Sequence, residues 1–114
     1  LTQKTAQKSG SIFTGGLEIC PEARRVFTDG KEVSLTRREF DLLLFFAENP
    51  GIAFSKDKLF DRIWGMDALG DTATVMVHIN RIREKIEPNP ATPVYIETVW
   101  GVGYRFRNDA GHKG

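Results

Sequence analysis

Residues 73–85 bring amide, guanidinium and small apolar side chains together within one short segment. The larger aliphatic residues recur there every three or four positions, which is typical of an amphipathic helix with one buried stripe. Val77, Asn80 and Arg81 lie on the opposite face of such a helix. Asparagine can pair bidentately with adenine and arginine with guanine, while valine can contact the methyl group of thymine. The chemistry available to this face is therefore readout of base edges in a major groove.

Further polar side chains flank this face. Arg83 and Lys85 are placed better for phosphate groups than for base edges, and phosphate contacts fix the position of a protein on a duplex. A second interpretation is an ordinary amphipathic helix with one exposed valine, which is no anomaly on a protein surface. The helix by itself leaves both interpretations open.

Capping residues and stop signals divide the middle of the chain into three helices. Thr36 and Glu39 form a capping box, in which each side chain satisfies a free backbone N–H of the first turn. Ser55 is a suitable N-cap for the second helix, and glycine or proline follows each helix. The expected helices are about 37–48, about 56–64 and about 72–87, the last with Asp71 or Thr72 as its cap.

Short strands are expected on both sides of the helices. Turn residues separate four strand segments before the helices, and Asp29-Gly30 is a strong hairpin signal. Two segments after the helices flank a glycine-rich tip at 100–103, which predicts a β-hairpin. Strands, three helices and a hairpin in this order predict an α+β winged helix-turn-helix, with the hairpin as the wing. The expected strands are 12–13, 17–20, 25–28, 32–35, 94–99 and 104–107.

Length and composition indicate one folded domain. A chain of 114 residues is long enough for a single core and too short for two ordinary domains. No apolar run approaches the ~20 residues of a membrane span, and a single cysteine fits a reducing cytoplasm. Residues 1–10 have the polar composition of an interdomain linker. Residues 11–108 are the expected domain and residues 109–114 a flexible C-terminal tail.

The balance of charge leaves a rival function open. The formal net charge is only +1, whereas domains that bind nucleic acid are often strongly basic. DNA binding would therefore depend on a local arrangement of charge. The rival is a winged helix used for protein–protein contact, which a weak response to salt would reveal. Binding of single-stranded nucleic acid ranks last, because Trp64 and Tyr104 are expected to be partly structural rather than stacking platforms.

Nothing in the sequence supports catalysis, a metal site or a cofactor. His78 and His112 are the only histidines, and no cysteine accompanies them at a metal-ligand spacing. Asp57 and Asp61 lie one helical turn apart and are expected on a solvated face. The glycines of 101–103 precede no helix, which favours a tight wing turn over a phosphate-binding loop.

Four sequence blocks follow one another in a specific order, and the resemblance that they carry extends over about residues 13–107. The blocks are TRREFDLL at 36–43, WG at 64–65, TVMVHINRIREKI at 74–86 and TVWGVGYRF at 98–106. Together they resemble the effector domain of response regulators of the OmpR/PhoB type. Each block alone is a weak signal, but four blocks at the expected spacing are specific.

The resemblance implies a four-stranded antiparallel N-terminal sheet, a three-helix bundle and a C-terminal wing. It implies sequence-specific transcriptional regulation, with the helix at about 72–87 in the major groove and the wing at about 99–103 at the minor groove. The other implied partners are an upstream receiver domain, a cognate histidine kinase, and RNA polymerase at the loop of about 65–71. Members bind direct repeats as head-to-tail dimers. Without DNA we expect a monomer, because no long exposed apolar stripe indicates a constitutive dimer.

The resemblance also implies roles for individual residues. Arg81 would read bases and Val77 would contact a methyl group. The chain departs from the family pattern at Ala73, at Met76 and at Trp100, where the family carries an arginine. Tryptophan lacks the positive charge that a narrow minor groove attracts, so we expect Trp100 to pack on sugar or on a partner protein. The implied phosphate-side contacts are Trp64, Thr74, His78, Arg83 and Thr98.

Overall fold

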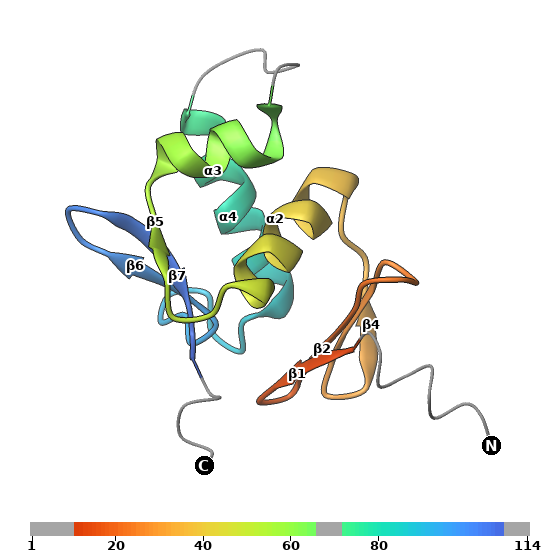
Figure 1. Ribbon diagram of the computed structural model, residues 1–114. Helices are drawn as coiled ribbons and strands as arrows, with labels where there is room; N and C mark the ends of the chain where they lie inside the picture. Colours follow the sequence, from red (N-terminus) through yellow and green to blue (C-terminus); the bar gives the residue numbers. More distant parts are fainter. Residues whose placement is uncertain (1–10, 66–71, 109–114) are drawn as a thin grey trace. The chain divides into compact units, whose positions relative to one another are not determined.

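The structure is a computed structural model that describes residues 11–65 and 72–108. The chain divides between Ser34 and Leu35 into two compact units, each with its own sheet (Figure 1). The expected linker at 1–10 and tail at 109–114 lie outside the described residues. So does the loop expected to contact RNA polymerase, apart from Gly65.

The N-terminal unit is a four-stranded antiparallel sheet with its strands in chain order. Asp29 and Gly30 have φ values of 50° and 85°, and positive φ at both central residues is what a type I′ hairpin turn requires. The last strand ends at Val33 rather than at the expected Leu35, because the chain then leads to the helix cap at Thr36. The strands are β1 (Ile12–Thr14), β2 (Leu17–Cys20), β3 (Arg25–Thr28) and β4 (Lys31–Val33).

Three helices begin the second unit: α2 (Arg37–Glu48), α3 (Lys56–Ile63) and α4 (Ala73–Ile86). The predicted capping box of α2 and the Ser55 cap of α3 are both confirmed. Thr72, one of the two residues expected as the cap of α4, occupies the cap position but makes no side-chain cap bond. Its backbone is already helical at φ −67° and ψ −12°, whereas a capping side chain needs an extended backbone. The other candidate, Asp71, is not among the described residues.

A three-stranded antiparallel sheet completes the second unit, in the order β5-β7-β6. The wing strands β6 (Ile96–Val99) and β7 (Gly103–Phe106) confirm the predicted hairpin, and β5 (Ala53–Phe54) was not predicted. β6 begins two residues later than expected, because the Glu87 carboxylate binds the backbone N–H groups of residues 94–96. These bonds engage the backbone N–H groups of the residues that lead into β6, so Val94 and Tyr95 do not pair as part of the strand.

The core of the second unit confirms the helical stripe expected on α4. Val75, Ile79, Ile82 and Ile86 are each at most 3% exposed, and α4 packs against both α2 and α3. The spacing of the apolar residues predicts a buried stripe on α3, formed by Leu59, Phe60, Ile63 and Trp64, but only Leu59 is buried there. Phe60 and Trp64 stack on each other and are half-buried.

Candidate nucleic-acid interface

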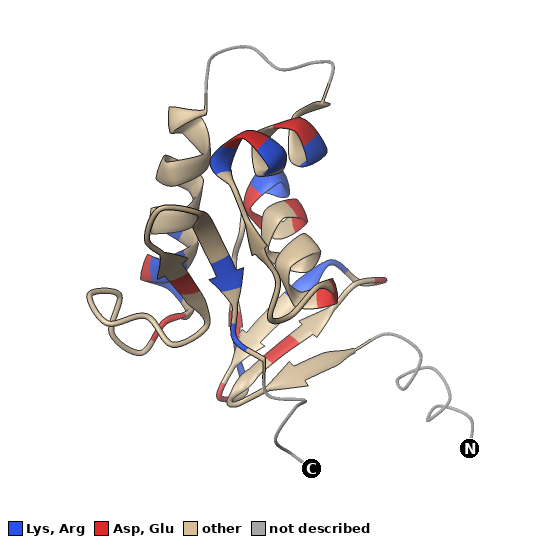
Figure 2. Ribbon diagram, turned by 60° about the vertical axis from the view of Figure 1, so that its left-hand side comes forward, with Lys and Arg blue, Asp and Glu red and all other residues tan. Residues whose placement is uncertain are grey.

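The exposed face of α4 carries the residues expected to read bases. Val77 is 47% exposed, and Asn80 and Arg81 are exposed on the same side of the helix, together with Ala73 and Glu84. The first half of α4 has no charged residue, whereas charges gather toward its C-terminal half (Figure 2). This face is therefore small and apolar at its start and polar further along, as predicted.

Trp64 and His78 meet where α3 and α4 come together. Their ring centroids are 4.9 Å apart in an edge-on arrangement, and Trp64 also stacks on Phe60 at 5.6 Å. The guanidinium carbon of Arg38 lies 5.7 Å from the Trp64 ring centroid, and its Nη1 donates to the Ile63 carbonyl at 2.8 Å. Trp64 therefore joins the two helices and keeps only part of its surface for a ligand.

His78 and Thr74 lie one turn apart on α4, and both are half-buried. The Nδ1 atom of His78 is 2.9 Å from the Thr74 carbonyl oxygen. A carbonyl only accepts hydrogen bonds, so Nδ1 must carry a hydrogen, and Nε2 of the neutral ring is then an acceptor. His78 can therefore donate to a phosphate only in its doubly protonated form.

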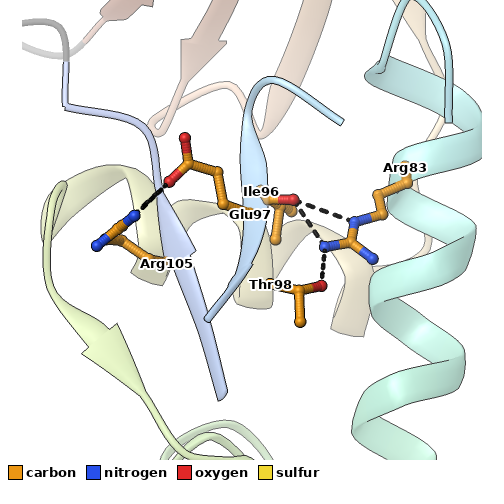
Figure 3. Close-up of polar contacts among 5 residues, drawn as sticks. All are labelled: Arg83, Ile96, Glu97, Thr98 and Arg105. Carbon is orange, nitrogen blue, oxygen red and sulfur yellow. Dashed lines mark hydrogen bonds and ion pairs between the residues drawn. The ribbon is translucent and has the colours of Figure 1, made fainter. Parts of the chain in front are cut away.

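Arg83 ties the C-terminal half of α4 to the wing (Figure 3). Its Nε and Nη2 atoms donate to the Ile96 carbonyl at 3.1 Å and 2.7 Å, and Nη2 also donates to Thr98 Oγ1 at 3.0 Å. Burial lowers the pKa of the guanidinium, while Tyr104 and Glu87 raise it; arginine nevertheless stays charged in proteins. Two of the expected phosphate contacts, Arg83 and Thr98, are thus brought together at one place.

Arg105 lies on the other side of β6 and is paired within the wing (Figure 3). Its Nε and Nη2 atoms donate to one Glu97 oxygen at 3.0 Å and 2.9 Å. The guanidinium of Arg107 lies 5.6 Å from the ring centroid of Tyr95. The wing strand therefore offers a ligand less positive charge than its sequence indicates.

A buried carboxylate connects α2 with α4. Glu39 is 2% exposed and accepts hydrogen bonds from Lys85 Nζ at 2.7 Å and from the Thr36 backbone N–H at 3.0 Å. Burial by itself raises the pKa of this carboxyl. The bonds from Lys85 and Thr36, with the charges of Lys85 and His78, outweigh burial and bring the pKa below its ordinary value of 4.5. Lys85, expected beside phosphates, is thus bound to Glu39.

The tip of the wing is apolar and exposed. Trp100 is 88% exposed and Val102 is 52% exposed. The backbone N–H of Val102 donates to the Val99 carbonyl at 2.9 Å and closes the turn. Residues 98–104 contain no Asp, Glu, Lys or Arg. They line a hollow together with Lys56, which stands in the first turn of α3.

The two residues of β5 hold the wing beside the start of α3. Ala53 pairs with Arg105 and Phe54 with Tyr104. The backbones approach so closely that a Cβ atom at Gly103 would lie 2.0 Å from the Phe54 carbonyl oxygen. A strand of two residues is too short to produce a periodic pattern. No sequence pattern therefore indicates that Lys56 is a neighbour of the wing.

None of the helices in the described part of the chain is long and apolar enough to cross a membrane. Residues 11–65 and 72–108 contain no group of three His, Cys, Asp or Glu side chains placed to hold a metal ion.

Similarity to known proteins identifies the family. Residues 30–106 match the family model described as "Transcriptional regulatory protein, C terminal". The chain is 48% identical over 91 residues to the alkaline phosphatase synthesis transcriptional regulatory protein SphR of Synechococcus elongatus, a match that covers 80% of this chain and 35% of SphR. It is 41% identical over 97 residues to the sensory transduction protein RegX3 of Mycobacterium tuberculosis, covering 85% and 43%.

Two solved structures share the fold. The response regulator DrrB of Thermotoga maritima, described as an OmpR/PhoB homolog, matches with a TM-score of 0.81 and 36% identity, over 93% of this chain and 49% of DrrB. The RstA DNA-binding domain of Klebsiella pneumoniae, solved in complex with the RstA box, matches with a TM-score of 0.76 and 34% identity, over 85% and 96%. This chain thus spans less than half of SphR and RegX3 and nearly all of the RstA domain. The chain has the winged-helix fold of OmpR/PhoB DNA-binding domains and belongs to the family of C-terminal domains of transcriptional regulatory proteins.

Proposed function

We propose that this domain binds specific sequences in double-stranded DNA, with α4 in the major groove and the wing at the minor groove. The observation that carries the proposal is the exposed face of α4. Val77, Asn80 and Arg81 lie there side by side, on a helix whose opposite face is fully buried. The RstA domain, which is 34% identical, was solved in complex with its DNA box.

Each side chain of the interface has a proposed contact. Arg81 pairs with guanine, Asn80 with adenine, and Val77 contacts a thymine methyl group. The residues at the edges of this face fix the domain on the backbone through phosphate or sugar contacts. These residues are Trp64, Thr74, His78, Arg83 and Thr98, with Trp100 at the wing tip.

The domain is proposed to be the output of a two-component regulator. The curated relatives are more than twice as long as their matched segments, which leaves room for a receiver domain phosphorylated by a histidine kinase. Further proposed contacts are RNA polymerase at about 65–71 and a second copy bound head-to-tail on a direct repeat. The domain alone is expected to be a monomer. The function is binding in the cytoplasm, where bacterial DNA lies, without a catalytic step or a cofactor.

The test is selection from a random double-stranded DNA pool at near-physiological salt, with the Arg81→Ala variant in parallel. An enriched motif that Arg81→Ala no longer selects is the expected result, with a loss of discrimination of ~1–3 kcal/mol. Arg62→Ala is the matched control, because Arg62 lies over the Phe45 ring, 5.1 Å from its centroid. An absence of binding even at low salt would favour protein–protein contact instead.

A further inference from the structure

The wing presents an apolar tip to solvent, and its strand β6 is bonded to α4. Trp100 and Val102 are 88% and 52% exposed, and the backbone bond from Val102 to Val99 closes the turn between them. Arg83 binds β6 at Ile96 and Thr98. A large apolar surface is therefore held away from the core of its own unit, as at a binding site.

The charges near the tip are as informative as its apolar residues. A narrow minor groove attracts arginine, lysine or histidine through its negative potential, and residues 98–104 include none of these. Lys56 is the one cation among the residues that line the hollow beside the tip. The tip therefore has no charged side chain with which to contact DNA, and the nearest cation in the lining of the hollow is Lys56.

We propose that the wing tip makes an uncharged contact with the minor groove, through the ring of Trp100 and the methyl groups of Val102. These groups pack on deoxyribose and base edges, and Lys56 pairs with a phosphate at the margin of the groove. The inference rests on the proposed DNA binding and specifies how the wing takes part in it. DNA is the expected ligand of the tip, because Arg83 joins the wing strand directly to α4, whose exposed face is proposed to bind DNA.

This contact has two consequences for recognition. Apolar packing releases no counterions, so the wing's share of affinity does not fall with salt as phosphate contacts do. Apolar side chains in the minor groove fit best at base steps that open easily, such as pyrimidine–purine steps. The domain should therefore not prefer a narrow A-tract at the position of the wing.

The experiment compares wing variants on the enriched duplex, in single half-site and tandem forms, over a series of salt concentrations. We expect Trp100→Ala to weaken binding about tenfold at every salt concentration on both duplexes, from the loss of the apolar surface that the ring buries. Trp100→Phe should keep most of the affinity. Trp100→Arg should steepen the slope of log affinity against log salt by about 0.9, and Lys56→Ala should reduce it by the same amount. Val94→Ala is the control, an exposed valine outside the tip, at 43% exposure.

Three other outcomes would overturn the inference. Unchanged binding of Trp100→Ala to both duplexes would show that the wing tip makes no contact with DNA. A loss confined to the tandem duplex would place Trp100 against the neighbouring copy of the domain. A wild-type domain that binds no duplex would overturn the proposed function itself, which separates that failure from a failure of the wing alone.

Discussion

The guanidinium of Arg83 binds the hydroxyl of Thr98 between α4 and β6, with Nη2 3.0 Å from Oγ1. The same guanidinium makes two hydrogen bonds to the Ile96 carbonyl. Arg83 is thus bound to the wing strand through both its neighbouring backbone and a side chain. These bonds fix the position of β6 relative to α4, the two elements that we propose lie in neighbouring grooves of DNA.

Replacement of Arg83 by alanine should act on both stability and binding. It removes three hydrogen bonds, so we expect the free energy of unfolding to fall by ~1–3 kcal/mol and affinity to fall about equally for all DNA sequences. Denaturant titration and binding to matched and mismatched duplexes measure the two effects. Arg105→Ala is the control on the other side of β6. A loss restricted to one base position would assign Arg83 to base readout instead.

The Glu39→Gln substitution should make the free energy of unfolding less dependent on pH in the acidic range. The pKa of Glu39 is lowered in the folded state, so its charged form stabilises the fold above the ordinary value of 4.5, and this contribution is lost as pH falls through the lowered pKa. At neutral pH we expect the variant to be ~1.5–3 kcal/mol less stable. The difference from wild type should shrink below pH 4.5. Urea denaturation at pH 7 and pH 3 tests this, with the exposed Glu48→Gln as control; a constant difference would contradict it.

Gly103→Ala should destabilise the second unit by more than its backbone conformation alone explains. The new methyl group would meet the Phe54 carbonyl oxygen at 2.0 Å, and we expect a loss above ~2 kcal/mol through forced separation of β5 and β7. Gly101→Ala is the matched control, because it has a φ of +82° but no atom within 4 Å of the added Cβ. That control should cost only ~1–2 kcal/mol. Equal losses in thermal or urea unfolding would argue against the steric explanation.

Glu87→Gln should loosen the approach to β6. The carboxylate accepts the N–H groups of Val94, Tyr95 and Ile96 at distances of 2.7–3.1 Å. An amide offers one acceptor oxygen in place of two, so we expect a loss of ~1.5–3 kcal/mol and faster hydrogen exchange at these three amides. Glu84→Gln, an exposed substitution on the same helix, should leave both measurements unchanged. Unaltered exchange in Glu87→Gln would show that the carboxylate does not hold this segment.

Elements that are marked by a periodic or local residue pattern could be predicted from the sequence. Val75, Ile79, Ile82 and Ile86 mark the buried side of α4 by their spacing alone, which also places Asn80 on the exposed side. The capping box at Thr36 is local chemistry within four residues and was predicted for the same reason.

Contacts between distant backbone atoms could not be predicted. Arg83 bonds to a carbonyl of Ile96, and Glu87 bonds to three backbone N–H groups, so no partner residue type indicates either contact. Thr72 stands at the cap position with a suitable side chain, but its backbone is helical and its hydroxyl makes no cap bond. Base-reading roles remain predictions, because exposure shows which side chains can meet DNA and not which bases they select.

The pairing of β5 with β7 also determines when the second unit can finish folding. Ala53 and Phe54 pair with residues about fifty positions later in the chain, and contacts of such long range form slowly because a large loop must close first. All three helices are synthesised before β7, so their apolar faces remain without this strand until the chain has emerged past Phe106. Polypeptides interrupted before that point should be open to proteolysis and aggregation. Among the described elements, β7 is therefore the last strand to become available for the sheet of this unit.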